Sequence, residues 1–212
     1  MKPRGLSRPS STPRRRPRPE LAVAGFLLSA CATATLPPPG VATRAAAASE
    51  WSGSVRVSVS GKDVRGRSRV LMAFRRPDAV RIEIPGSSGA RLVAVAREGR
   101  LTAVLPGERA FLESAATAAD LEALLGVALS PGELMDVLVG VAPAGLRGYE
   151  AQWGDTLPRR VEAILADGTR LKATVEDAQT GLDLPEAAFL PPPHPGYRRV
   201  DADEARRLLG GR

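Results

Sequence analysis

The chain has 212 residues, 30 of them basic and 23 acidic, and its formal net charge of +7 would suit a nucleic-acid-binding protein. The distribution of these charges along the chain argues against that class. Seven basic residues and one acidic residue precede Cys31, which leaves 23 basic and 22 acidic residues from there onward. Cys31 is the only cysteine and His194 the only histidine. This composition excludes an intrachain disulfide framework and a cysteine-based zinc site, and it argues against a histidine-dependent triad.

An apolar run of about ten residues leads into Cys31 and follows a basic segment. Since a bilayer span needs about 20 apolar residues, this run is too short to cross a membrane, and the order is typical of a signal peptide. The run ends in Leu28-Ser29-Ala30-Cys31, which resembles the lipobox of bacterial lipoproteins in all four positions. A short buried helix that carries a free cysteine is the alternative.

The lipobox resemblance implies cleavage after Ala30 and covalent diacylglyceryl and N-acyl modification of Cys31, with no other cofactor. It divides the chain into a signal peptide (1–30), a lipidated cysteine with a flexible Pro-rich tether (31–48) and one domain (49–212). Ala32 rather than Asp follows the cysteine, which by the family's sorting rules implies the outer membrane. The protein would be anchored by lipid on the periplasmic face.

Alternating apolar and polar residues predict strands after the tether, and Gly-containing turns between them predict an antiparallel meander. Arg65, Arg67 and Arg69 share one face of the second strand, which we expect to be solvated; contact with anionic lipid headgroups or an acidic partner is the alternative. The expected strands are 55–60, 65–74, 80–84, 92–96, 101–105, 110–112, 149–153, 161–166 and 171–175. Asp167-Gly168 predicts a hairpin turn between the last two.

Two short helices are expected between the strands, and a third near the C-terminus. Thr117 with Asp120, and Ser130 with Glu133, have the spacing of capping boxes, and glycines at 126 and 140 can end the two helices. A last short helix should begin near Asp201. Ala45 to Ala48 could begin another short helix.

The order of strands, two helices and more strands resembles the LolA/LolB-like fold of bacterial lipoprotein carriers. The local match is the stretch 124–131 followed by Leu134, Leu138, Gly140 and Pro143. The resemblance implies an α+β fold in which a strongly curved antiparallel sheet forms a half-open, unclosed barrel. Short helices would pack on its concave side.

The same resemblance implies a carrier or receptor that binds acyl chains of lipoproteins or lipids in a hydrophobic cavity, during outer-membrane lipoprotein localisation. Such a protein is not an enzyme, binds no nucleic acid and would act as a monomer. The loop 85–89 departs from the LolB pattern, because it has no bulky apolar residue at its tip for delivering lipoproteins into the membrane. The alternative is a non-transport envelope lipoprotein that binds a protein partner in outer-membrane assembly or polymer export.

Apolar residues of the expected strands and helices are the candidates for lining an acyl-chain cavity. The same residues could instead form an ordinary close-packed core, and the sequence leaves both open. No metal site, catalytic residue, nucleophile-elbow, P-loop or dinucleotide motif is present. The candidate cavity residues are Val57, Val59, Phe74, Ile82, Leu121, Leu125, Leu134 and Leu138, with Leu71, Val93 and Val95 among further possibilities.

Overall fold

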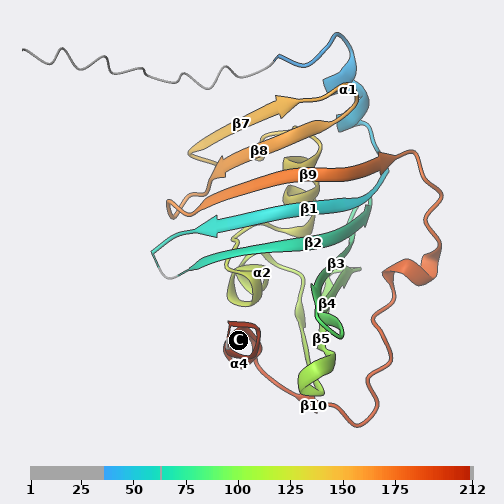
Figure 1. Cartoon of the computed structure of the whole chain (residues 1–212), viewed down its shortest axis with the longest axis vertical. Helices are drawn as coiled ribbons and strands as arrows, with labels where there is room; N and C mark the ends of the chain where they lie inside the picture. The colour runs from blue at the N-terminus through green and yellow to red at the C-terminus, as the bar shows by residue number, and fades with distance from the viewer. Residues whose placement is uncertain (1–35, 63, 211–212) are drawn as a thin grey trace, which may run out of the picture. The chain divides into compact units, whose positions relative to one another are not determined.

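The computed structural model describes residues 36–62 and 64–210, so the predicted signal peptide, the lipobox and Cys31 lie outside the described residues (Figure 1). The strands are β1 (Glu50–Ser60), β2 (Arg65–Arg75), β3 (Ala79–Gly86), β4 (Gly89–Arg97), β5 (Arg100–Leu105), β6 (Ala110–Ala115), β7 (Gly148–Trp153), β8 (Pro158–Ile164), β9 (Arg170–Thr180) and β10 (Arg198–Arg199). The helices are α1 (Val41–Ala46), α2 (Ala118–Leu125), α3 (Pro131–Leu138) and α4 (Ala202–Gly210), with 3₁₀ turns η1 (Pro106–Glu108) and η2 (Glu186–Phe189).

All ten strands belong to one sheet in the order β10-β6-β5-β4-β3-β2-β1-β9-β8-β7. Every neighbouring pair is antiparallel except β10 with β6. The sheet bends sharply between β2 and β3, and its end strands do not pair to close a barrel (Figure 1). The predicted α+β fold with an unclosed, curved antiparallel sheet is therefore confirmed, while the short parallel edge strand β10 was not predicted.

The helices α2 and α3 pack on the inner side of the bend, where their apolar faces join the sheet in one hydrophobic core (Figure 1). Their ends follow the predicted capping chemistry. Thr117 Oγ1 accepts a hydrogen bond from the Asp120 amide at 3.2 Å, and Ser130 and Glu133 form a complete capping box. Gly126 ends α2 with a φ of 75°, a left-handed conformation that glycine adopts without strain.

One segment differs from its sequence expectation. The helix α1 lies within the stretch predicted to be a flexible tether, and it begins four residues before the helix expected from Ala45. Its Val41 amide donates to the Pro38 carbonyl at 3.0 Å, and Val41 and Ala45 are buried. The proline-rich composition led us to expect a tether. The prolines lie just before the helix begins, however, where proline is tolerated.

No helix in the described part of the chain is long and apolar enough to cross a membrane.

Candidate binding cavity

A cavity of about 270 Å³ lies between the inner face of the sheet and the helices α2, α3 and α4. An engineered cavity of about 150 Å³ with an apolar lining stays dry and binds benzene, so this one is large enough for an apolar ligand. Most of the lining is aliphatic and comes from four strands, the β1–β2 connection, three helices and the α2–α3 connection. The apolar lining residues are Val57, Val59, Val64, Val70, Met72, Ile82, Ile84, Leu121, Leu125, Val127, Leu129, Leu134, Val137, Leu138, Leu171, Ala173 and Leu209.

The structure brings seven of the eight candidate residues together around this cavity: Val57, Val59, Ile82, Leu121, Leu125, Leu134 and Leu138. Phe74, the eighth, does not line it. The β1–β2 register places Phe74 directly opposite Trp51, and the two rings stack with their centroids 5.5 Å apart. Phe74 is thus part of the close-packed core. A role in holding acyl chains stays a prediction for the other seven.

Three further candidates lie on the outer face of the sheet. Leu71 alternates with the inward Val70 and Met72, and 41% of its surface is exposed. Val93 and Val95 alternate with the core residues of β4, and they are buried because η2 packs on the outer face of β3 and β4. The alternation of β2 could have excluded Leu71. That the long connection between β9 and β10 covers β4 cannot be predicted from the residues of β4 alone.

The mouth of the cavity lies where β2 and β3 separate. Residues 71–75 of β2 pair with β3, but residues 65–70 pair only with β1, and residues 84–86 of β3 pair only with β4. Figure 1 shows the two strands diverging from their shared corner. The parts of these two strands that do not pair with each other contribute Gly66, Arg67, Ser68 and Ile84 to the lining, and β4 contributes Arg91.

A β-bulge directs Arg91 to this opening. Ile84 pairs with Leu92 and Pro85 pairs with Ala90, so Arg91 has no opposing residue on β3. A bulge of this kind re-aims a side chain. The Arg91 guanidinium donates to the carbonyl of Leu209, at the C-terminal end of α4, where a cation also interacts favourably with the helix dipole. The sequence gives no sign of this bulge, so Arg91 was not among the candidates.

The two central helices are held differently. The C-terminal part of α3 is fixed by polar contacts: Arg76 Nη2 lies 2.8 Å from Asp136 Oδ1, and the Tyr149 hydroxyl donates to the Val137 carbonyl at 2.9 Å. Burial, with a smaller contribution from the negative charge of Asp136, raises the pKa of the Tyr149 phenol. Within the described residues α2 has no hydrogen bond or ion pair to the sheet and is held there by apolar contacts.

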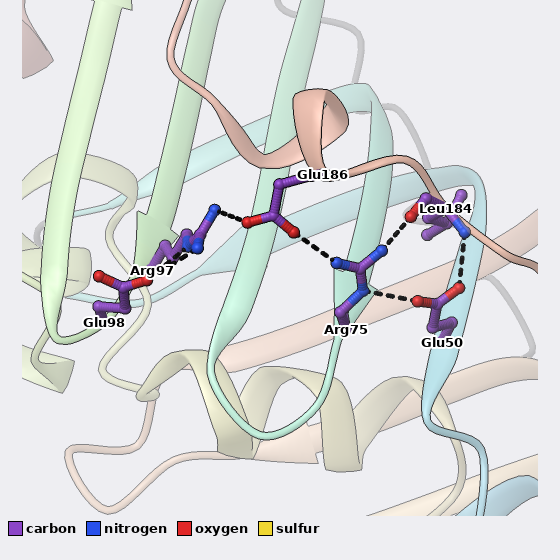
Figure 2. A network of polar contacts seen from close by, with 6 residues as sticks. All are labelled: Glu50, Arg75, Arg97, Glu98, Leu184 and Glu186. Carbon is purple, nitrogen blue, oxygen red and sulfur yellow. Dashed lines mark hydrogen bonds and ion pairs between the residues drawn. The ribbon is translucent and has the colours of Figure 1, made fainter.

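A second polar network lies away from the cavity and is structural (Figure 2). Glu50 accepts hydrogen bonds from Arg75 Nε at 2.6 Å and from the Leu184 amide at 2.8 Å. Arg75 Nη1 donates to Glu186 at 2.9 Å, and Glu186 also pairs with Arg97. The Leu184 amide, and after it Arg75, holds the pKa of the Glu50 carboxyl below its usual value. The network ties the connection between β9 and β10 to three strands.

Among the described residues no group of three or more His, Cys, Asp or Glu side chains is placed to hold a metal ion. Nothing in the cavity lining has the arrangement of a nucleophile and a base. The lining is apolar except for Gly66, Arg67, Ser68 and Arg91.

No family model matches the chain, and no curated protein matches it. Similar solved structures include a LolA superfamily protein from Nitrosomonas europaea, with 9% identity, 74% of this chain and 99% of that chain covered, and a TM-score of 0.44. Another is an uncharacterised conserved protein from Thermus thermophilus, with 13% identity, 75% of this chain and 96% of that chain covered, and a TM-score of 0.43. A third is a domain from Vibrio parahaemolyticus provisionally assigned as an outer membrane lipoprotein-sorting protein, with 8% identity, 70% of this chain and 94% of that chain covered, and a TM-score of 0.38. Similarities of this strength carry no functional inference for this chain.

Proposed function

We propose that the chain is a lipid-anchored envelope protein that binds acyl chains of lipoproteins or lipids in the cavity, as a carrier or receptor in outer-membrane lipoprotein localisation. The observation that supports this most is the apolar cavity of about 270 Å³ between the bent sheet and the helices. Removing an acyl chain from water contributes about 0.8 kcal/mol for each CH₂ group, so a dry aliphatic lining is enough for binding. No catalytic group is needed.

The proposed location rests on the sequence. Leu28-Ser29-Ala30-Cys31 would make Cys31 the lipidation site, and the lipid would anchor the protein to the periplasmic face of the outer membrane. The lipoprotein cargo comes from the sequence resemblance to LolA/LolB-like proteins. The β3–β4 turn consists of Ser87 and Ser88, which are unsuited to entering a membrane, so the proposed role is binding rather than delivery.

The alternative function is binding of a protein partner in outer-membrane assembly or polymer export. A groove of about 470 Å³ on the outer face supports it, because the exposed side chain of Leu71 lies there among polar and charged neighbours that include Arg69 and Glu83. Apolar surface with a polar rim is a feature of partner-binding sites, whereas a single exposed leucine is common on any protein surface. This alternative predicts that the inner cavity is dispensable.

The experiment compares two adjacent leucines of α2. Leu125 lines the cavity and is half-buried, whereas Leu124 is 2% exposed and packs in the core without lining the cavity. The full chain carrying Cys31→Ser would be titrated with the neutral apolar probe N-phenyl-1-naphthylamine, whose fluorescence rises in apolar sites. Thermal unfolding would be followed in parallel.

We expect Leu125→Glu to lower probe affinity at least tenfold with a small loss of stability, because its carboxylate can reach water at the cavity. Leu124→Glu should mainly unfold the protein. If wild type binds no probe, or if Leu125→Glu lowers binding and stability together, the region is an ordinary core and the partner-binding alternative takes precedence.

A further inference from the structure

The mouth of the cavity has a strand edge that is left unpaired within the described chain. Residues 65–70 of β2 pair with β1 on one side, and no described strand pairs with them on the other side. We propose that this edge pairs with an extended polypeptide segment whose acyl chain occupies the cavity. The ligand is then an acylated polypeptide and not a free lipid. This proposal rests on the proposed acyl-chain binding and narrows its ligand class.

The unpaired edge presents backbone hydrogen-bonding groups. Successive residues of a strand direct their N–H and C=O groups to opposite sides, so alternate residues of 65–70 direct both groups away from β1. Such a row of groups is a template for another strand. An extended peptide that adds to a sheet edge supplies the matching N–H and C=O groups, and a fatty acid has no such series.

The side chains at this edge leave room for another backbone. Gly66, Ser68 and Val70 line the cavity, and a Cβ atom added to Gly66 would meet no heavy atom within 4 Å beyond its chain neighbours. Glycine inside a strand is used at bulges, at tight bends and where another backbone approaches closely. The β1–β2 register runs through Gly66 without a shift, which excludes the bulge. A segment paired with this edge would therefore hold an attached acyl chain at the cavity.

The outward side chains along the same edge are basic. Arg65 and Arg67 lie opposite serines of β1 and form no ion pair among the described residues, whereas Arg69 Nε lies 3.1 Å from Glu176 Oε2. Opposite charges on neighbouring strands stabilise a sheet, and like charges destabilise it. The added segment should thus carry Asp or Glu at its outward positions. A second copy of this chain is a poor occupant, because pairing through the same edge would bring two sets of arginines together.

The competing explanation is that the arginines only protect an exposed edge from pairing. The test displaces N-phenyl-1-naphthylamine from the full chain carrying Cys31→Ser. The competitors share a ten-carbon acyl chain, because if about 150 Å³ holds the six carbons of benzene, about 270 Å³ holds roughly ten. They are decanamide and a decanoyl tetrapeptide amide in which Thr and Glu alternate. Two further peptides carry N-methyl groups either on both Thr or on both Glu residues.

We expect the parent peptide to displace the probe at a concentration at least tenfold lower than decanamide, because several backbone hydrogen bonds add to the acyl contacts. In an added strand, the Thr amides and the Glu amides point to opposite sides. One N-methylated peptide should therefore fall to within about twofold of decanamide, and the other should stay within about threefold of the parent. The two modified peptides are matched controls for each other.

Measurements on the protein assign the effect to β2. Hydrogen–deuterium exchange of residues 65–70 should slow with the parent peptide and not with decanamide, and exchange at the other edge strand β7 should not change. Arg65→Gln, which leaves the cavity lining intact, should weaken peptide binding at least threefold without changing decanamide binding. Arg100→Gln, an exposed arginine on β5, is the control and should change neither.

The outcomes separate this proposal from the proposed function. If the peptide binds no better than decanamide, the ligand is a free lipid and the proposal is wrong, while acyl-chain binding stands. Equal binding of the two N-methylated peptides, or unchanged exchange at residues 65–70, also overturns strand addition. An equal loss with Arg100→Gln and Arg65→Gln would reduce the charge preference to general electrostatics and contradict the acidic segment. If no decanoyl ligand displaces the probe, the proposed function itself fails.

Discussion

The ring of Phe74 on β2 lies parallel to the indole of Trp51 on β1, with an interplanar angle of 2° and 5.5 Å between the centroids. Both residues are at most 1% exposed. The stacked pair fills the end of the sheet at the β2–β3 corner, which is also where the two strands are still hydrogen-bonded. Phe74 therefore belongs to the hydrogen-bonded end of the β2–β3 pair, opposite the end at which the two strands separate.

Phe74→Ala should destabilise the protein by about 3–5 kcal/mol, because it removes a buried ring and leaves a void beside Trp51. The measurement is urea unfolding followed by tryptophan fluorescence. Leu71→Ala, on the same strand but exposed on the other face, is the control and should change the free energy of unfolding by about 0.5 kcal/mol or less. A loss below about 1 kcal/mol for Phe74→Ala would contradict the stacked core.

Glu50 makes the stability of the folded protein depend on pH in the acid range. Its pKa is lowered in the folded protein, so its contribution is complete above the unfolded value of about 4.3 and is lost as the pH falls through the lower folded value. Glu50→Gln should reduce the loss of stability below about pH 4 and destabilise the protein at pH 7. The measurement is the thermal midpoint between pH 3 and pH 7.

The exposed Glu122 on α2 provides the control for this pH series. Glu122→Gln should keep the acid dependence of wild type. An identical acid dependence for wild type and Glu50→Gln would show that the bonds from Leu184 and Arg75 do not stabilise the ionised carboxyl.

Filling the cavity distinguishes an open site from a close-packed core. Ala173 on β9 is buried and lines the cavity, so Ala173→Leu would place extra methylene groups into existing space. We expect a stability equal to that of wild type or up to about 1 kcal/mol higher, together with at least tenfold weaker probe binding. A destabilisation above about 1 kcal/mol is the signature of overpacking and would mean that no such space exists.

Lipidation at Cys31 can be checked independently of the fold. Cys31→Ser should leave an unprocessed precursor that takes up no labelled palmitate, whereas wild type is labelled and shortened by cleavage after Ala30. Labelling of the variant to the wild-type level would contradict the lipobox interpretation. Ser29→Thr, a change beside the cysteine that keeps a small side chain, serves as the control and should still be labelled.

The parts of the fold that depend on local chemistry could be predicted from the sequence. Thr117 and Ser130 cap their helices through hydrogen bonds to residues three positions on, and the alternation of β1 marks its inward face. These interactions involve residues close together in the chain, so they can be predicted from the local sequence. The same local patterns brought seven cavity residues into the candidate set.

The parts that depend on register and on distant segments could not be predicted. Phe74 lies outside the cavity because the β1–β2 register sets it against Trp51, and alternation does not reveal register. The mouth exists because β3 stops pairing with β2 after Glu83, and Arg91 reaches it through a bulge. The burial of Val93 depends on a connection almost a hundred residues further along the chain.

The most direct test of the cavity is calorimetric titration of decanoate into the full chain carrying Cys31→Ser, at two temperatures. Binding of one chain in an apolar cavity predicts a saturable isotherm with one site per protein and a negative heat-capacity change. Heats that do not saturate, or a heat-capacity change near zero, would contradict acyl-chain binding in this cavity.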